Sequence, residues 1–351
     1  MGTEFLRVTD DELRRVFCEL GFFTSSPALA PLLRLAYRAA LVSDITVLLE
    51  GETGTGKQVL ALAIHRLDQK RKASPFITMH CGSLSEALAE SELFGHQRGA
   101  FTSAVTHRKG LFQSAHRGTL FLDDVNDLPL HLQAKLLDVL QRGTVRAVGS
   151  DRETPVDVRV IAAANQPLEP LVVQNRFRAD LFHRLNVVRL SLPPLRNRMQ
   201  DLPGLVLAFA DRHRDIYHPI ERVEPELTSF LQLQSFPGNV RELENDVKRM
   251  LFSKTSGTSL GIADRHSRSD GPQMDGQPDL LDEAAAKIWT AISGQGISYA
   301  QAIEMIEGRV LEAALSVGGR TRRQVAQLLR TSERTLYHKI RAHELRSQRS
   351  P

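Results

Sequence analysis

A glycine-rich loop is the first feature of this chain that could do chemistry, and it suits a polyphosphate. The loop reads Gly51-Glu52-Thr53-Gly54-Thr55-Gly56-Lys57 and is followed by Gln58. Glycines let backbone N–H groups approach a polyphosphate without a Cβ in the way, and a lysine at the end of such a loop reaches the β- and γ-phosphates. Loops of this kind usually have Ser or Thr, which binds Mg²⁺, directly after the lysine, but this chain has Gln58 there. We therefore expect phosphates, water and acids elsewhere in the site to hold the metal.

A pair of acids, Asp123 and Asp124, ends the apolar stretch that begins at Gly118. In a nucleotide-binding fold, acids at the end of a buried strand handle Mg²⁺ and the attacking water. The plainer alternative is a pair of helix N-caps after a strand. Because the phosphate loop lies upstream, the sequence favours the catalytic interpretation.

Two other segments carry residues suited to contact with partners. The segment Glu90–Ala104 has two glycines and an aromatic residue at its middle, which is typical of a mobile loop with an apolar tip; a plain surface loop is the alternative. The segment Phe177–Leu185 places Arg178 and Arg184 six residues apart in a short helical stretch.

The C-terminal end has the charge and spacing of a DNA-binding module. We expect short helices at Thr321–Leu329 and Ser332–Ala342, separated by two residues, which is helix-turn-helix spacing. From Arg320 onward the chain has nine basic and two acidic residues, so this end carries +7 and the remainder −3 of the net charge of +4. The residues that the second helix would offer to a major groove are Arg334, Thr335, Tyr337, His338, Lys339 and Arg341.

Strands that alternate with helices must position these residues. The buried strands that we predict are Ile45–Leu49, Pro75–Cys81, Gly118–Leu122, Val156–Ala163 and Val187–Leu190. The alternation predicts an α/β fold with a parallel, doubly wound sheet. From about 201 to 253 the pattern is helical only, and the stretch after it is rich in Ser, Gly, Asp and Pro, which is typical of a flexible linker.

Composition excludes several classes of protein. The chain has 351 residues, 42% hydrophobic and 25% charged, as in soluble globular proteins of two or three domains. No apolar run approaches the roughly 20 residues that span a bilayer, and the N-terminus has no secretory pattern. The two cysteines, Cys18 and Cys81, are expected to be buried thiols in a reducing compartment, so we predict a cytoplasmic protein without a membrane partner.

Taken together, these residues resemble the sigma-54-dependent transcription activators of bacteria, or enhancer-binding proteins, which belong to the AAA+ ATPases. The likeness runs from about Gly21 to Leu251 and from about Glu304 to Leu345. The segments that carry it are Gly51–Lys57, Glu90–Ala104, Gly118–Asp124, Phe177–Leu185, Leu192–Arg196 and Pro237–Asn245. The domains that the resemblance implies are a short N-terminal segment (1–20), an AAA+ α/β core (21–192), an AAA+ helical lid (193–253), a linker (254–280) and a Fis-type helix-turn-helix domain (281–351).

The resemblance also implies roles for individual residues. The loop and Lys57 would bind ATP, Asp123 would coordinate Mg²⁺, and Asp124 would polarise the attacking water. Asn165 would be the first sensor and Arg241 the second, while Arg178 and Arg184 would act as arginine fingers in a neighbouring subunit's site. Such fingers imply a ring of identical subunits, usually a hexamer. The loop that would contact sigma-54 of RNA polymerase consists of Gly99, Ala100, Phe101, Thr102, Ser103 and Ala104, and the C-terminal domain would bind an upstream, enhancer-like DNA site.

The sequence departs from the family pattern at six positions. Gln58 replaces Glu, His80 replaces Asn, Arg117 replaces Gly, Asp124 replaces Glu, Ala164 replaces Thr and Ser103 replaces Gly.

These departures leave two alternatives to a working activator. The chain would be a weakly hydrolysing co-regulator that joins the ring of a competent relative, or a regulator independent of sigma-54. About 20 residues precede the core, against on the order of 120 for a receiver domain, so we expect control by a regulatory partner protein, by expression level or by a relative that co-assembles.

Overall fold

The computed structural model describes residues 8–265 apart from 84, 101–105, 215–218 and 255, and the single residues Ser298, Gln301, Leu311, Ala326 and Arg341. The chain divides into two units, Met1–Arg268 and Ser269–Pro351. The linker and helix-turn-helix that the sequence predicts lie almost entirely outside the described residues. Within the described part of the chain, no helix is long and apolar enough to cross a membrane.

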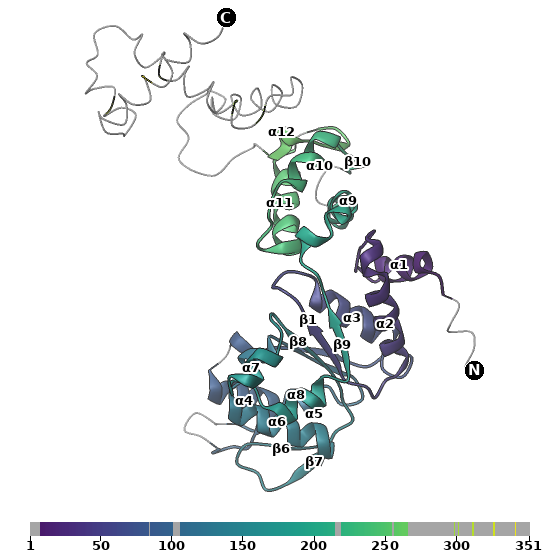
Figure 1. Ribbon diagram of the computed structural model, residues 1–351. Coiled ribbons are helices and arrows are strands. Elements are labelled where there is room, and N and C mark those ends of the chain that lie inside the picture. The colour runs from purple at the N-terminus through teal and green to yellow at the C-terminus, as the bar shows by residue number, and fades with distance from the viewer. Residues whose placement is uncertain are drawn as a thin grey trace, which may run out of the picture. The chain divides into compact units, whose positions relative to one another are not determined.

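A five-stranded parallel sheet forms the centre of the first unit (Figure 1). Its strands, in spatial order, are β2 (Phe76–His80), β5 (Thr119–Asp123), β8 (Arg159–Ala164), β1 (Val47–Glu50) and β9 (Val188–Ser191). All four strand pairs are parallel, which confirms the predicted α/β fold. The register pairs Glu50 with Ala164 and His80 with Asp123, so the strand ends that carry polar residues meet at one edge of the sheet.

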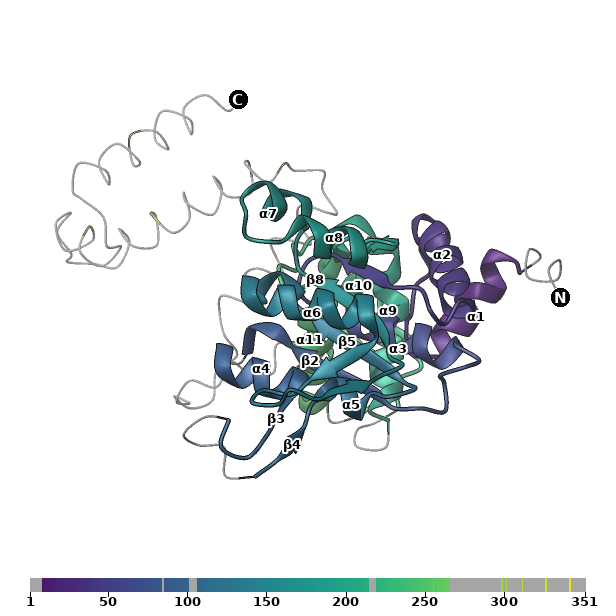
Figure 2. The same cartoon turned by 90° about the horizontal axis from the view of Figure 1, so that it is seen from below.

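Helices cover both faces of the sheet, as Figure 2 shows for α2 and α3 on one side and α4 and α6 on the other. Alternate residues of the strands divide between two cores: Val47 and Leu49 pack toward the first face, and Leu48 packs toward the second. The helices on the first face are α1 (Asp10–Glu19), α2 (Ala30–Leu41) and α3 (Lys57–Leu67). Those on the second face are α4 (Glu86–Phe94), α5 (Leu111–Ser114), α6 (Leu130–Arg142), α7 (Glu169–Val173) and α8 (Ala179–Leu185).

The N-terminal segment folds onto the core rather than standing apart from it. Thr9 and Glu12 form a capping box that starts α1, and Phe17 is completely buried against the first face. Cys81 is buried, but Cys18 is exposed, so the prediction of two buried thiols is wrong for Cys18. Cys18 lies next to Phe17 in α1, and a helix that buries one face leaves the neighbouring residue on the other.

The segment predicted as a loop from Glu90 is helical at its start. Helix α4 runs to Phe94, because Leu93 and Phe94 are buried apolar side chains that anchor its last turn. A short hairpin follows, in which β3 (Gly95–His96) pairs with β4 (Arg108–Lys109). A second hairpin, β6 (Thr144–Arg146) with β7 (Glu153–Pro155), was not predicted.

The second hairpin is joined to the first. The backbone N–H of Val148 donates to the carbonyl of Gly95 at 2.8 Å, and that of Gln97 donates to the carbonyl of Val148 at 3.0 Å.

A smaller helical part with its own core follows β9. Its helices are α9 (Leu202–Arg212), α10 (Pro225–Gln232), α11 (Asn239–Ser253) and α12 (Ile262–Arg265). The prediction of helices alone over residues 201–253 is wrong at one place, because β10 (Arg222–Val223) pairs with β11 (Ser259–Leu260). Two residues are too few for a periodicity to show a strand. We refer to residues 195–265 as the lid.

Candidate active site

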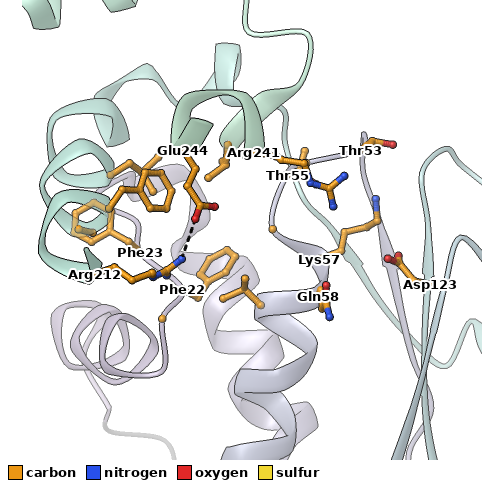
Figure 3. A pocket seen from close by; sticks show the side chains of 18 of the residues that line it. Phe22, Phe23, Thr53, Thr55, Lys57, Gln58, Asp123, Arg212, Arg241 and Glu244 are labelled. Atoms are coloured by element: carbon orange, nitrogen blue, oxygen red, sulfur yellow. Dashed lines mark ion pairs between the residues drawn. The ribbon is translucent and has the colours of Figure 1, made fainter. Parts of the chain in front are cut away.

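A cavity of about 430 Å³ lies between the glycine-rich loop, the carboxyl edge of the sheet and the lid (Figure 3). The predicted site residues that line it are Thr53, Gly54, Thr55, Gly56, Lys57, Gln58, Asp123, Asp124 and Arg241. His80 lines it as well. The fold therefore brings together the loop, the pair of acids and one of the two sensors from three separate parts of the sequence.

The glycine-rich loop has the backbone that a phosphate needs. Gly54 and Gly56 have φ angles of +81° and +104°, a region that L side chains rarely adopt. A Cβ on Gly54 would lie 2.2 Å from the carbonyl oxygen of Gly238 in the lid, so only glycine fits. The Lys57 ammonium donates to the carbonyls of Gly51 at 2.7 Å and Glu52 at 3.2 Å, which holds it inside the curve of the loop. Burial lowers the pKa of Lys57, and the carboxylates of the acid pair act in the opposite direction.

The two acids differ in their surroundings. Asp123 ends β5 with its side chain 15% exposed, and its Oδ2 lies 3.2 Å from Nδ1 of His80 on the neighbouring strand. Burial, and next the charge of Asp124, raise the pKa of Asp123. Asp124 follows in the left-handed region, with φ +53°, and donates its backbone N–H to Asp123 Oδ1 at 3.2 Å. A non-glycine residue in this conformation turns the chain sharply at the end of the strand.

The acid pair fits a magnesium ion that is held mostly by the nucleotide. Mg²⁺ binds through one or two carboxylates, substrate phosphates and several waters. Asp123 offers a half-buried carboxylate that Asp124 repels, and a cation there would relieve this repulsion. No group of three or more His, Cys, Asp or Glu side chains that could hold a metal by itself occurs among the described residues.

The lid is attached directly to the glycine-rich loop. The backbone N–H groups of Val240 and Arg241 donate to the Gly54 carbonyl at 3.0 and 3.3 Å. Arg196 makes two hydrogen bonds to Glu52, of 2.8 and 2.6 Å. This interaction, with a further bond from Asn239, lowers the pKa of Glu52 to about 2. The side chain of Glu52 thus ties the loop to the lid, and Glu52 is not among the residues that line the cavity.

Arg198 is a second link that the sequence did not reveal. It is 2% exposed, lines the cavity and donates to the Thr55 carbonyl at 2.6 Å. Arg196 belongs to a segment that carried the family resemblance, but nothing in the sequence gave it or Arg198 a role.

Besides Gly51 and Glu52 of the loop, the predicted residues Asn165, Arg178 and Arg184 are not among those that line the cavity. Arg178 and Arg184 are exposed side chains, Arg178 just before α8 and Arg184 within it. Arg178 bonds Asp180 at 2.7 Å, and Arg184 donates to the Leu140 carbonyl at 2.7 Å. Asn165 follows β8, and its backbone N–H donates to the side chain of Asn126 at 3.2 Å.

The end of the cavity opposite Lys57 is apolar and was missed in the sequence. The apolar side chains that line the cavity are Phe22, Phe23, Leu205, Phe209 and Val240. Figure 3 shows Phe22 and Phe23 away from Lys57 and Asp123. These apolar side chains come from the segment before α2 and from two lid helices, so no local pattern could have grouped them. A flat apolar base fits such an end, as in most small-molecule sites.

The predicted contacts with macromolecules are described only in part. Gly99 and Ala100 of the predicted sigma-54 loop are described, whereas Phe101, Thr102, Ser103 and Ala104 lie outside the described residues. Of the residues predicted to bind DNA, only Arg341 is described.

Comparisons with known proteins agree with this geometry. Residues 22–191 match the family model of the sigma-54 interaction domain, and residues 196–267 match that of the AAA+ ATPase lid domain. The chain is 38% identical to the regulatory protein AtoC of Escherichia coli K12 over 91% of its own length and 67% of that protein. It is 51% identical to the anaerobic nitric oxide reductase transcription regulator NorR of Escherichia coli O157:H7 (strain EC4115 / EHEC), over 59% of its length and 41% of NorR.

A solved structure supports the same likeness. NtrX from Brucella abortus, crystallised in complex with ATP, superposes with a TM-score of 0.64 at 27% identity, over 95% of this chain and 72% of NtrX.

Proposed function

We infer the function of this chain from its family: it belongs to the sigma-54-dependent transcription activators and contains their AAA+ ATPase domain. We propose that it binds an upstream DNA site, assembles into a ring and uses ATP hydrolysis to remodel the sigma-54 form of RNA polymerase for promoter opening. The observation that carries this proposal is the cavity in which the glycine-rich loop, Asp123, Asp124 and the lid residue Arg241 meet.

The residues of the cavity have complementary roles in hydrolysis. Lys57 would exchange the carbonyls of Gly51 and Glu52 for the β- and γ-phosphates of ATP. Asp123 would hold Mg²⁺, which when bound supplies positive charge against the phosphates. Asp124 would orient a water and accept its proton, and its turned backbone places the carboxyl group on the cavity wall.

Arg241 would connect the phosphates to the lid. Its backbone is already bonded to the glycine-rich loop, so a change at the γ-phosphate shifts two joined elements together. Such a link converts the loss of a phosphate into a movement of the lid.

Assembly would complete the site. Phosphoryl transfer needs positive charge at the developing transition state, and a trans arginine supplies it only when subunits meet. The exposed position of Arg178 and Arg184 supports this role, and we propose a hexamer. The segment Gly99–Ala104 would contact sigma-54, and the segment Ser332–Ala342 would contact DNA in the cytoplasm. A regulatory partner protein would control the activity.

The test is open-complex formation on a sigma-54 promoter with an upstream site for this protein. We expect ATP-dependent opening by the wild type and none by Lys57→Ala. An Asp44→Ala variant, changed at an exposed residue before β1, at the end of that strand opposite the loop, should open the promoter normally. Binding to DNA and assembly of a ring without any opening would contradict the proposed function.

A further inference from the structure

An ion pair joins the two lid helices at the apolar end of the cavity. Arg212 is the last residue of α9 and Glu244 lies in α11, with Nη1 and Oε1 3.6 Å apart. Figure 3 shows the pair beside Phe22, away from Lys57 and Asp123. Both side chains line the cavity, so a nucleotide that fills it has to lie against them.

Further contacts hold this pair in place. Nζ of Lys248 lies 3.0 Å from the same Oε1 of Glu244. The Arg212 guanidinium lies 5.5 Å from the centre of the Phe209 ring, within the range of a cation–π interaction. The contacts from Arg212 and Lys248 fix the direction of the Glu244 carboxylate, and its side chain, which is 24% exposed, lines the cavity. An ionised carboxylate only accepts hydrogen bonds, so its natural partner is a donor such as a hydroxyl group.

The position of Glu244 along α11 places it beside the sugar of a nucleotide. Arg241 lines the cavity three residues earlier, so the two share one face of the helix and are about 4.5 Å apart along its axis. The bond from Arg241 to Gly54 marks the phosphate end, and the aromatic residues mark the end that suits the base. In a nucleotide the sugar joins phosphates to base. Figure 3 shows Glu244 in this intermediate place, between Arg241 and the side chains of Phe22 and Phe23.

We propose that Glu244, positioned by Arg212, accepts hydrogen bonds from the ribose hydroxyls of the bound nucleotide. This contact would determine the preference of the site for a ribonucleotide. The inference rests on the proposed binding of ATP. A hydrogen bond to a charged acceptor is stronger than one between neutral groups, which makes the sugar a point of discrimination.

Calorimetric titration of the full chain tests this proposal with ATP and 2′,3′-dideoxyATP, which keeps the base and the triphosphate. We expect the wild type to bind ATP about tenfold more tightly than the dideoxy nucleotide. Glu244→Ala should bind both with the same Kd, close to that of the wild type for 2′,3′-dideoxyATP. Lys248→Ala is the matched control and should keep the preference, because it leaves the carboxylate and Arg212 in place.

The outcomes separate the inference from the function on which it rests. Equal Kd values in the wild type, or a preference for ATP that survives in Glu244→Ala, would overturn the role of Glu244 while leaving ATP binding intact. A wild type that binds neither nucleotide would instead overturn the proposed function, and the inference with it. Glu244→Gln, which keeps the shape of the side chain and a neutral acceptor, should show an intermediate preference and guards against an effect of misfolding.

Discussion

The two ends of the central sheet carry similar charged residues but differ in how far the charges are paired. At the amino end, Arg159 and Asp68 form an ion pair of 2.7 Å in which both side chains are fully buried. Beside it, Arg71 is 1% exposed and bonds Asp157 at 2.6 Å and Asp44 at 3.0 Å. Each buried cation here has a carboxylate partner, and the cluster holds the strand ends together.

At the carboxyl end the charges are arranged for a ligand. Asp123 and Asp124 are neighbours of like charge, and Lys57 is buried with hydrogen bonds to backbone carbonyls rather than to a carboxylate. Burial disfavours the charged form of Lys57 and of Asp123 alike, which lowers one pKa and raises the other. Both clusters contain buried basic and acidic side chains, so their residue types do not distinguish a structural cluster from a binding site. What distinguishes them is whether each buried charge has a partner of opposite charge.

The largest expected effect at the amino end follows from breaking the buried pair. Although burial alone would raise the pKa of Asp68, hydrogen bonds from Ser43 and Arg159 lower it overall. Asp68→Ala leaves Arg159 buried without its carboxylate, so we expect the free energy of unfolding to fall by about 3 kcal/mol. Urea denaturation measures this.

The matched control lies in the same cluster. Asp44, whose side chain is 74% exposed, also pairs with a buried arginine, Arg71. We expect Asp44→Ala to lower the free energy of unfolding by less than about 1 kcal/mol. Equal losses in the two variants would show that burial of the pair does not set its contribution.

A smaller effect on the free energy of unfolding is expected from the backbone at the two ends of β5. Arg117 precedes this strand with φ +64° and Asp124 follows it with φ +53°, and neither is a glycine. Arg117 is exposed, so Arg117→Gly should relieve strain and raise the free energy of unfolding by about 0.5 kcal/mol, since the cost of the left-handed conformation exceeds the entropy that glycine loses. Thermal unfolding would measure the change.

Arg117→Ala is the control, because it removes the side chain but keeps the Cβ, and we expect no stabilisation from it. ATP hydrolysis should be unchanged in both variants, since Arg117 lies at the end of β5 opposite the cavity. A gain in stability for the alanine variant would place the strain in the side chain rather than in the backbone.

The strands and the glycine-rich loop could be predicted because their signals are local. Buried parallel strands such as β1 and β8 are continuous apolar runs, and the loop is a contiguous motif. A local signal does not extend to the side chain of Glu52, which bonds Arg196 from a segment about 140 residues further along.

The apolar end of the site could not be predicted, because its residues are not close together in the sequence. Phe22, Phe209 and Glu244 come from distant segments, and only the packing of the lid brings them to one cavity. His80 was noted as an unusual residue at the end of its strand, but its proximity to Asp123 follows from the register of β2 with β5. Short hairpins such as β6 with β7 leave no periodicity to detect.

The central claim is that the carboxyl end of the sheet is an ATPase site completed by a neighbouring subunit. The direct test is the steady-state rate of ATP hydrolysis per subunit as a function of protein concentration, for the wild type, Lys57→Ala and Arg178→Ala. We predict a rate that rises steeply with concentration in the wild type and falls by about 10³-fold in Lys57→Ala. In Arg178→Ala the rate should be lost although ATP still binds. A rate per subunit that does not depend on concentration, or an Arg178→Ala variant as active as the wild type, would contradict the account.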